Sequence, residues 1–134
     1  MKKTIVSTAV GCLVAGLAFA AIDASAATIR VECEQRIAER SKISVDGHKL
    51  APLPAGQMYR AQVVSGANSA TSPGEALVGD EVEFDFDSDR GDIAEGAVAI
   101  PANFIVNGNV TGKILAPDGS TVISDTVACR VRNR

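Results

Sequence analysis

The most constraining feature of this chain is an alternation of apolar and polar residues that recurs along its length. Residues 29–34, 42–46, 58–63 and 81–87 each carry an apolar side chain at every second position. Because successive side chains of a β-strand point to opposite faces, this period of two predicts strands with one buried face. The chain is therefore expected to be all-β, and no segment shows a convincing helical period.

Turn-forming residues separate these segments at intervals of about ten residues. Turns are predicted at 46–47, 52–56, 65–66, 72–74, 79–80, 90–91, 107–108 and 117–119. Asn107-Gly108 readily takes the positive φ angles of a type I′ turn, so it predicts a two-residue hairpin between residues 104–106 and 109–115. At most a short turn is expected at residues 35–40 and at residues 93–99.

The C-terminal segment predicts a final strand over about residues 121–131. Its core-facing residues are expected to be Val127, Cys129 and Val131. Together with the regular turns, these strands predict a small antiparallel β-sandwich of about seven strands with immunoglobulin-like architecture. A small β-barrel is the alternative. A chain of 134 residues is long enough for one such domain, which we place at residues 27–134.

The first 26 residues have the pattern of a cleaved export signal. A basic start at Lys2 and Lys3 precedes a run of small and apolar residues, and Ala24-Ser25-Ala26 matches the A-x-A pattern of a signal peptidase site. Cleavage is expected after Ala26, with Ala20 as the second choice. A transmembrane anchor is the alternative, since the apolar run is about long enough to span a bilayer. The short, lysine-led start is typical of bacteria, so we expect export to the periplasm or the outside, with no membrane anchor after cleavage.

Removal of residues 1–26 leaves two cysteines, Cys33 and Cys129, near the two ends of the domain. In an oxidising compartment an even pair predicts a disulfide. The loop that it closes would hold nearly the whole domain, which stabilises a fold by roughly 4–5 kcal/mol in chain-entropy models. Free buried thiols and an intermolecular bridge are the alternatives.

A run of acidic residues is the sharpest candidate for a functional site. On a strand, Glu81, Glu83, Asp85, Asp87 and Asp89 would line one face. Like charges this close repel one another, so a calcium ion or basic side chains of a neighbouring strand should offset them. The tentative calcium ligands are Asp85, Asp87, Asp89 and Asp92, and no other cofactor is expected. The alternatives are a solvated acidic face and a surface, including Glu81 and Glu83, that docks a protein.

Basic residues cluster on the two terminal strands. Arg30, Arg130, Arg132 and Arg134 would share an outer face with acidic neighbours. Cross-strand ion pairing is the simplest interpretation. The alternative is an interaction surface formed by Arg30, Arg130 and Arg132, which would let an acidic face of one molecule meet the basic face of the next in a homo-oligomer.

Composition and motifs narrow the function. A net charge of −3 and an aromatic content of 4% disfavour nucleic-acid binding. The single histidine, His48, and the absence of nucleophile, zinc-protease and phosphate-loop motifs disfavour an enzyme. We expect an exported non-catalytic module that binds a protein or cell-envelope partner, or a structural subunit. The alternatives are a calcium-stabilised binding module that uses residues 81–92, and a small secreted hydrolase or hydrolase inhibitor.

Overall fold

The computed structural model describes residues 26–37 and 39–133. The predicted signal peptide (residues 1–26) and Arg134 therefore lie outside the described residues, apart from Ala26 itself. Within the described residues, no helix is both long and apolar enough to cross a membrane.

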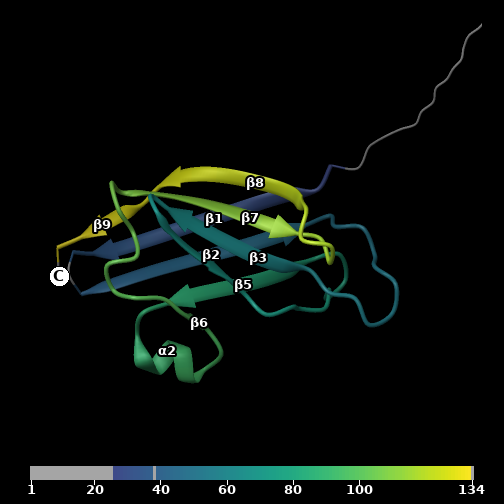
Figure 1. Cartoon of the computed structure of the whole chain (residues 1–134), viewed down its shortest axis with the longest axis horizontal. Coiled ribbons are helices and arrows are strands. Elements are labelled where there is room, and N and C mark those ends of the chain that lie inside the picture. The colour runs from purple at the N-terminus through teal and green to yellow at the C-terminus, as the bar shows by residue number, and fades with distance from the viewer. Residues whose placement is uncertain (1–25, 38, 134) are drawn as a thin grey trace, which may run out of the picture.

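Two β-sheets, in which most neighbouring strands run antiparallel, pack face to face (Figure 1). The first has the order β6-β5-β2-β1-β9 and the second the order β4-β3-β7-β8. The strands are β1 (Thr28–Arg36), β2 (Arg40–His48), β3 (Arg60–Ser65), β4 (Asn68–Thr71), β5 (Val82–Asp87), β6 (Val98–Ala99), β7 (Asn109–Leu115), β8 (Thr121–Ala128) and β9 (Arg130–Arg132). One short helix, α2 (Arg90–Ala94), lies between β5 and β6, where the sequence predicted only a turn at 90–91.

The predicted sandwich is confirmed, and the sheets do not close into a barrel. The order β1-β2-β5 corresponds to strands A, B and E of an immunoglobulin-like sandwich, and β4-β3-β7-β8 corresponds to C′, C, F and G. At the end of the first sheet, β9 pairs in parallel with the last three residues of β1. The first and the last described strands therefore lie in the same sheet.

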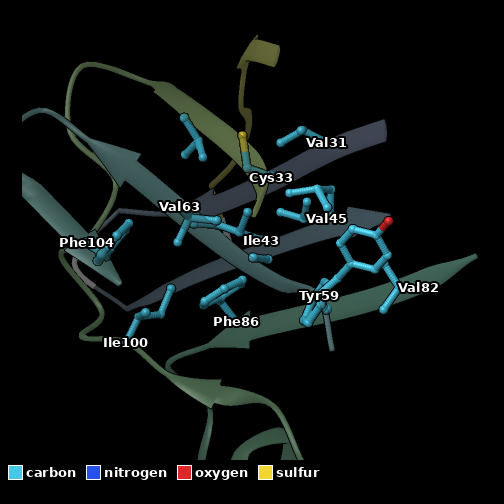
Figure 2. Packing of buried hydrophobic residues seen from close by; sticks show 14 of the residues in the cluster. Val31, Cys33, Ile43, Val45, Tyr59, Val63, Val82, Phe86, Ile100 and Phe104 are labelled. Atoms are coloured by element: carbon cyan, nitrogen blue, oxygen red, sulfur yellow. The ribbon is translucent and has the colours of Figure 1, made fainter. Parts of the chain in front are cut away.

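The core lies between the sheets, where the apolar side of each alternating segment is buried (Figure 2). The inward residues include Val31 and Cys33 of β1, Ile43 and Val45 of β2, and Phe86 of β5. Antiparallel register sets Val31 opposite Val45 and Cys33 opposite Ile43, while Val45 pairs with Phe84 on the other side. The predicted inward faces of these strands are therefore confirmed.

The segment from Ile100 to Val106 crosses from one sheet to the other, and it corrects one sequence expectation. The turn at Asn107-Gly108 forms with φ angles of 56° and 68°, as a type I′ turn requires. Residues 104–106 do not form a strand, however, and only Val106 bridges to Asn109. Buried hydroxyls hold the crossing segment instead: Ser41 donates to the Ala102 carbonyl, and Ser65 accepts from the Val106 N–H.

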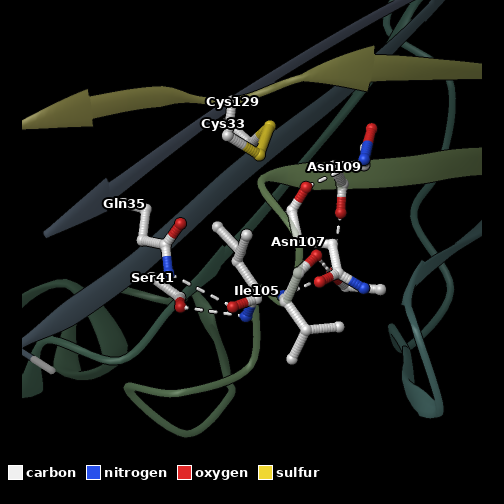
Figure 3. Close-up of a disulfide and its surroundings, with 9 residues drawn as sticks. Cys33, Gln35, Ser41, Ile105, Asn107, Asn109 and Cys129 are labelled. Carbon is white, nitrogen blue, oxygen red and sulfur yellow. Dashed lines mark hydrogen bonds between the residues drawn. A yellow bond between two sulfur atoms is a disulfide. The ribbon is translucent and has the colours of Figure 1, made fainter. Parts of the chain in front are cut away.

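The predicted last strand is divided at Cys129 (Figure 3). Its first part, β8, pairs with β7 in the second sheet, and its short continuation, β9, pairs with β1 in the first sheet. Cys129 bonds to Cys33 at the point where the chain changes sheets, with a Cα–Cα distance of 4.7 Å. The disulfide is therefore as predicted, whereas Val131 is 49% exposed rather than facing the core.

Candidate functional site

The acidic residues of β5 face outward, on the side of the first sheet that lies away from the core. Glu83 and Asp85 are exposed there, and Asp46 of the neighbouring strand β2 stands opposite Glu83 in the antiparallel register. Ser44 donates a hydrogen bond of 2.8 Å to Asp85. In the described part of the chain, none of these three carboxylates forms an ion pair with a basic side chain. We call Asp46, Glu83 and Asp85 the acidic face.

The electrostatics of Asp46 reflect this concentration of negative charge. Partial burial raises the pKa of its carboxyl above the ordinary value, and the charges of Glu83 and Asp85 raise it further. Glu81 lies just before β5, and its Oε2 atom is 3.4 Å from Nδ1 of His48. His48 and Arg30, of which Arg30 stands opposite Asp46 on β1, lower the Asp46 pKa but do not cancel the rise.

Asp87 has a different environment from the rest of the acidic run. It follows the same alternation as Glu83 and Asp85, yet its residue exposure is only 1%, because Arg40 and the start of α2 lie against it. Arg40 donates to both Asp87 oxygens, at 2.9 and 2.6 Å, and also to Asp92. The expectation that a basic residue of a neighbouring strand offsets the acidic run is confirmed at this end of the strand.

Protonation of the cluster is governed by the same contacts. Burial alone would raise the pKa of Asp87, but the hydrogen bonds from Arg40 and from the Asp89 N–H outweigh it and lower the pKa to about 2. The side-chain hydrogen bond with Asp87 raises the pKa of Asp92. The Arg40 pKa is raised chiefly by its hydrogen bonds to Asp87. Asp87 is therefore an ionised carboxylate in an ion pair at neutral pH.

Helix α2 begins where the acidic strand ends, because Asp89 caps it. The Asp89 side chain accepts from the N–H groups of Gly91 (3.0 Å) and Asp92 (3.2 Å), which have no partner in the first turn of a helix. Asp92 then lies in that first turn, where negative charge stabilises a helix. The sequence predicts Asp89 on the outer face of a strand, whereas in the structure it caps α2.

The four tentative calcium ligands thus have separate roles. Asp85 accepts from Ser44, Asp87 and Asp92 bind Arg40, and Asp89 caps α2. Over residues 26–37 and 39–133, no three side chains of the metal-binding types converge as a ligand group. Calcium binding stays a prediction.

A shallow groove of about 590 Å³ adjoins the acidic face. Its lining includes Ser44 and Phe84, together with Glu95 and Val98 from the segment after α2. Glu75, from the loop after β4, also lines it. Lys42 is the one basic residue in the lining. Acidic residues therefore outnumber basic ones in this groove.

The predicted basic surface is largely neutralised. Arg132 of β9 contacts Glu34 of β1 at 2.7 Å, and Arg30 contacts Glu32 at 2.5 Å within β1. Arg130 stands beside Glu34 in the parallel register. One ion pair therefore crosses from β9 to β1 and another lies within β1, on the same outer surface of the first sheet as the acidic face.

Sequence reasoning missed two residues of the site, Arg40 and Asp46. The sequence predicts a strand and a turn at Asp46, and at most a short turn at Arg40. Only the antiparallel pairing of β2 with β5, which sets Asp46 opposite Glu83, brings Arg40 and Asp46 to the acidic run.

Comparison with protein-family models, with curated proteins and with solved structures finds no match.

Proposed function

We propose that this protein is an exported, non-catalytic binding module whose acidic face docks a positively charged segment of a partner protein. The observation that carries the proposal is the group of carboxylates of Asp46, Glu83 and Asp85, which lie together on two paired strands and form no ion pair among residues 26–37 and 39–133. Charges of one sign beside a groove attract and orient a partner of the opposite sign.

The strands that carry the acidic face, the charge of the adjoining groove and the disulfide support the same proposal. The acidic face lies on strands rather than on loops, so the backbone that carries its carboxylates is already ordered before a partner binds. The groove beside it adds Glu75 and Glu95 to the negative charge. Export is supported by the Cys33–Cys129 disulfide, a bond that persists in oxidising compartments.

A binding measurement tests the proposal with a fluorescent decalysine peptide as the probe. The full chain is expressed with its leader and purified after export, and peptide binding is followed by fluorescence anisotropy at low salt. The double variant Glu83→Gln/Asp85→Asn is expected to weaken binding at least tenfold, because it removes two charges of the acidic face. Added salt should weaken binding to the unchanged protein in the same direction.

A matched variant separates the acidic face from net charge alone. Glu39→Gln/Asp125→Asn removes one exposed glutamate and one exposed aspartate away from the acidic face, in the turn before β2 and on β8 of the second sheet, so both variants change the net charge equally. The control is expected to bind almost as tightly as the unchanged protein. Equal weakening by the two double variants would contradict the proposal, as would no binding at all at low salt.

The two alternatives predict different results. A calcium-stabilised module would melt several degrees higher in millimolar calcium than in EDTA, and the acidic-face proposal needs no such shift. A small hydrolase or hydrolase inhibitor gains no specific support from the described contacts, and it stays a prediction.

A further inference from the structure

The edges of the two sheets differ greatly in length. The edge strands β6, β9 and β4 have 2, 3 and 4 residues, whereas β8 has 8. In the described part of the chain, β8 pairs only with β7, so its other side presents a row of unpaired backbone groups. It lies at the rim of the molecule in Figure 1. Long open edges invite pairing with another strand, and proteins normally shorten, charge or cover them.

The residues of β8 do little to block such pairing. Its sequence from Thr121 to Ala128 is TVISDTVA, which has no proline, no lysine and no glycine, and Asp125 is its one charged residue. β-branched residues dominate it, and these favour strands. Val122 is 41% exposed on the outer side of the sheet. By contrast, the part of β1 that β9 leaves open carries the charged side chains of Arg30 and Glu32.

The backbone hydrogen bonds between β8 and β7 show which backbone groups of β8 are unpaired. Cys129, just after β8, donates its N–H to Gly108 on the β7 side. Backbone groups alternate in direction along the regular part of an antiparallel strand, so those of Ser124 and Thr126 point away from β7. The register with β7 shifts between Ile114 and Leu115, which interrupts the alternation at Val122. The Thr126 N–H accordingly bonds to the side chain of its neighbour Asp125, at 2.9 Å, rather than to β7.

We propose that β8 pairs antiparallel with β8 of a second copy of this chain, which makes a two-fold dimer and joins the two four-stranded sheets edge to edge. In the favoured register Ser124 faces Ser124 of the second copy, and Val122 faces Thr126. This register pairs the outward-pointing backbone groups of the two Ser124 residues, and it sets the exposed Val122 beside the β-branched Thr126 of the second copy. The strand is thus complementary to itself, which is what a two-fold interface requires.

Charge selects this register over the next one along the strand. A two-fold pairing shifted by one residue sets Asp125 directly opposite Asp125, and like charges in that position destabilise a sheet. The Ser124 register avoids the clash.

Sedimentation of the exported protein over a range of concentrations tests the proposal. The mass is expected to rise toward that of a dimer, and Ser124→Lys should weaken association at least tenfold because it places two lysines face to face. Ser124→Pro should act similarly, since it removes only an outward-pointing N–H and a proline is tolerated at such an edge position. Ser69→Lys, the same change on the opposite edge strand β4, is the matched control and should leave the dimer intact.

Cross-linking tests the register separately. Ser124→Cys should be joined between copies by a short bis-maleimide, because the two Cα atoms lie about 5.5 Å apart in a hydrogen-bonded pair. Val122→Cys should not be joined, since the two positions are offset by four residues, or about 13 Å along the strand. A chain that stays monomeric at millimolar concentration overturns the proposal, and so does a dimer that Ser124→Lys leaves unchanged or that Ser69→Lys also dissociates. Glu83→Gln/Asp85→Asn lies outside this interface and is expected to leave the dimer unchanged.

Discussion

At the scale of single residues, the ion-pair cluster of Arg40, Asp87 and Asp92 determines how the acidic strand ends. Arg40 reaches from β2 to Asp87 on β5 and to Asp92 on α2, so one guanidinium connects three elements. A guanidinium has several donors in a fixed plane and suits this arrangement better than an ammonium. Asp87 can be buried as an ion because it accepts hydrogen bonds from Arg40 and from the Asp89 N–H.

The lowered pKa of Asp87 predicts how stability depends on pH. The carboxyl titrates near 2 in the folded protein and near 4 in an unfolded chain, so the unfolded state binds more protons between these values. The contribution of the ion pair is therefore complete above pH 4 and is lost as the pH falls toward 2. Asp87→Asn is expected to cost about 1–3 kcal/mol at pH 7 and much less at pH 2.

Urea unfolding of the two proteins at several pH values measures this difference. Asp85→Asn is the control, because the same substitution two residues away removes an exposed carboxylate without an ion pair, and it should change the free energy of unfolding by less than about 0.5 kcal/mol. A cost for Asp87→Asn that is the same at pH 7 and pH 2 would contradict the role assigned to its charge.

At the scale of elements, close packing between the sheets depends on the centre of β7. Gly112 faces the core there, and a Cβ atom at this position would lie 2.7 Å from a methyl carbon of Val31 and 3.1 Å from one of Val45. These side chains come from β1 and β2 in the opposite sheet. A glycine in a strand interior often marks such an approach, although its flexibility weakens the strand itself.

Gly112→Ala is therefore expected to destabilise the fold by about 1–3 kcal/mol, because the added methyl overfills the core. Chemical unfolding gives the value, and a double-mutant cycle identifies its cause. In a Val31→Ala background, which removes the nearest methyl groups, Gly112→Ala should cost less. An unchanged cost in that background would show that contact with Val31 is not the reason.

At the scale of the whole molecule, one covalent bond links the first strand to the end of the chain. The disulfide spans 96 residues and lies where the chain passes from β8 in one sheet to β9 in the other. A domain of this size buries only about two-thirds of its unfolded surface, so a long-range link contributes a large share of its stability. It also holds β9 beside β1, where only three residue pairs form the ladder.

Cys33→Ser/Cys129→Ser is expected to lower the free energy of unfolding by about 2–5 kcal/mol. Urea unfolding measures the loss, and the unchanged protein in excess dithiothreitol should approach the same midpoint. If the double variant unfolds at the midpoint of the oxidised protein, the disulfide does not stabilise the domain as argued.

Much of the fold was determined by the sequence itself. Alternation predicted which side chains of β1, β2 and β5 face the core, because a strand alternates its side chains whatever it pairs with. Asn107-Gly108 predicted its own turn, since the required φ angles are local properties of those residues. The two cysteines outside the expected leader predicted the disulfide by their even number and by the oxidising compartment that an export signal would imply.

Other features were decided only by the tertiary structure. Alternation assigns Asp87 to a face, but its burial depends on Arg40 and α2, which reach it through strand pairing and a helix cap. The change of sheet at Cys129 depends on which strands offer β8 and β9 an open edge, and residues 104–106 have strand-like composition yet serve as a crossing. The physical reason is the same in each case. Alternation and turn preference depend on a few neighbouring residues. The strand that pairs with a residue, and the side chains that bury it, come from segments dozens of residues away.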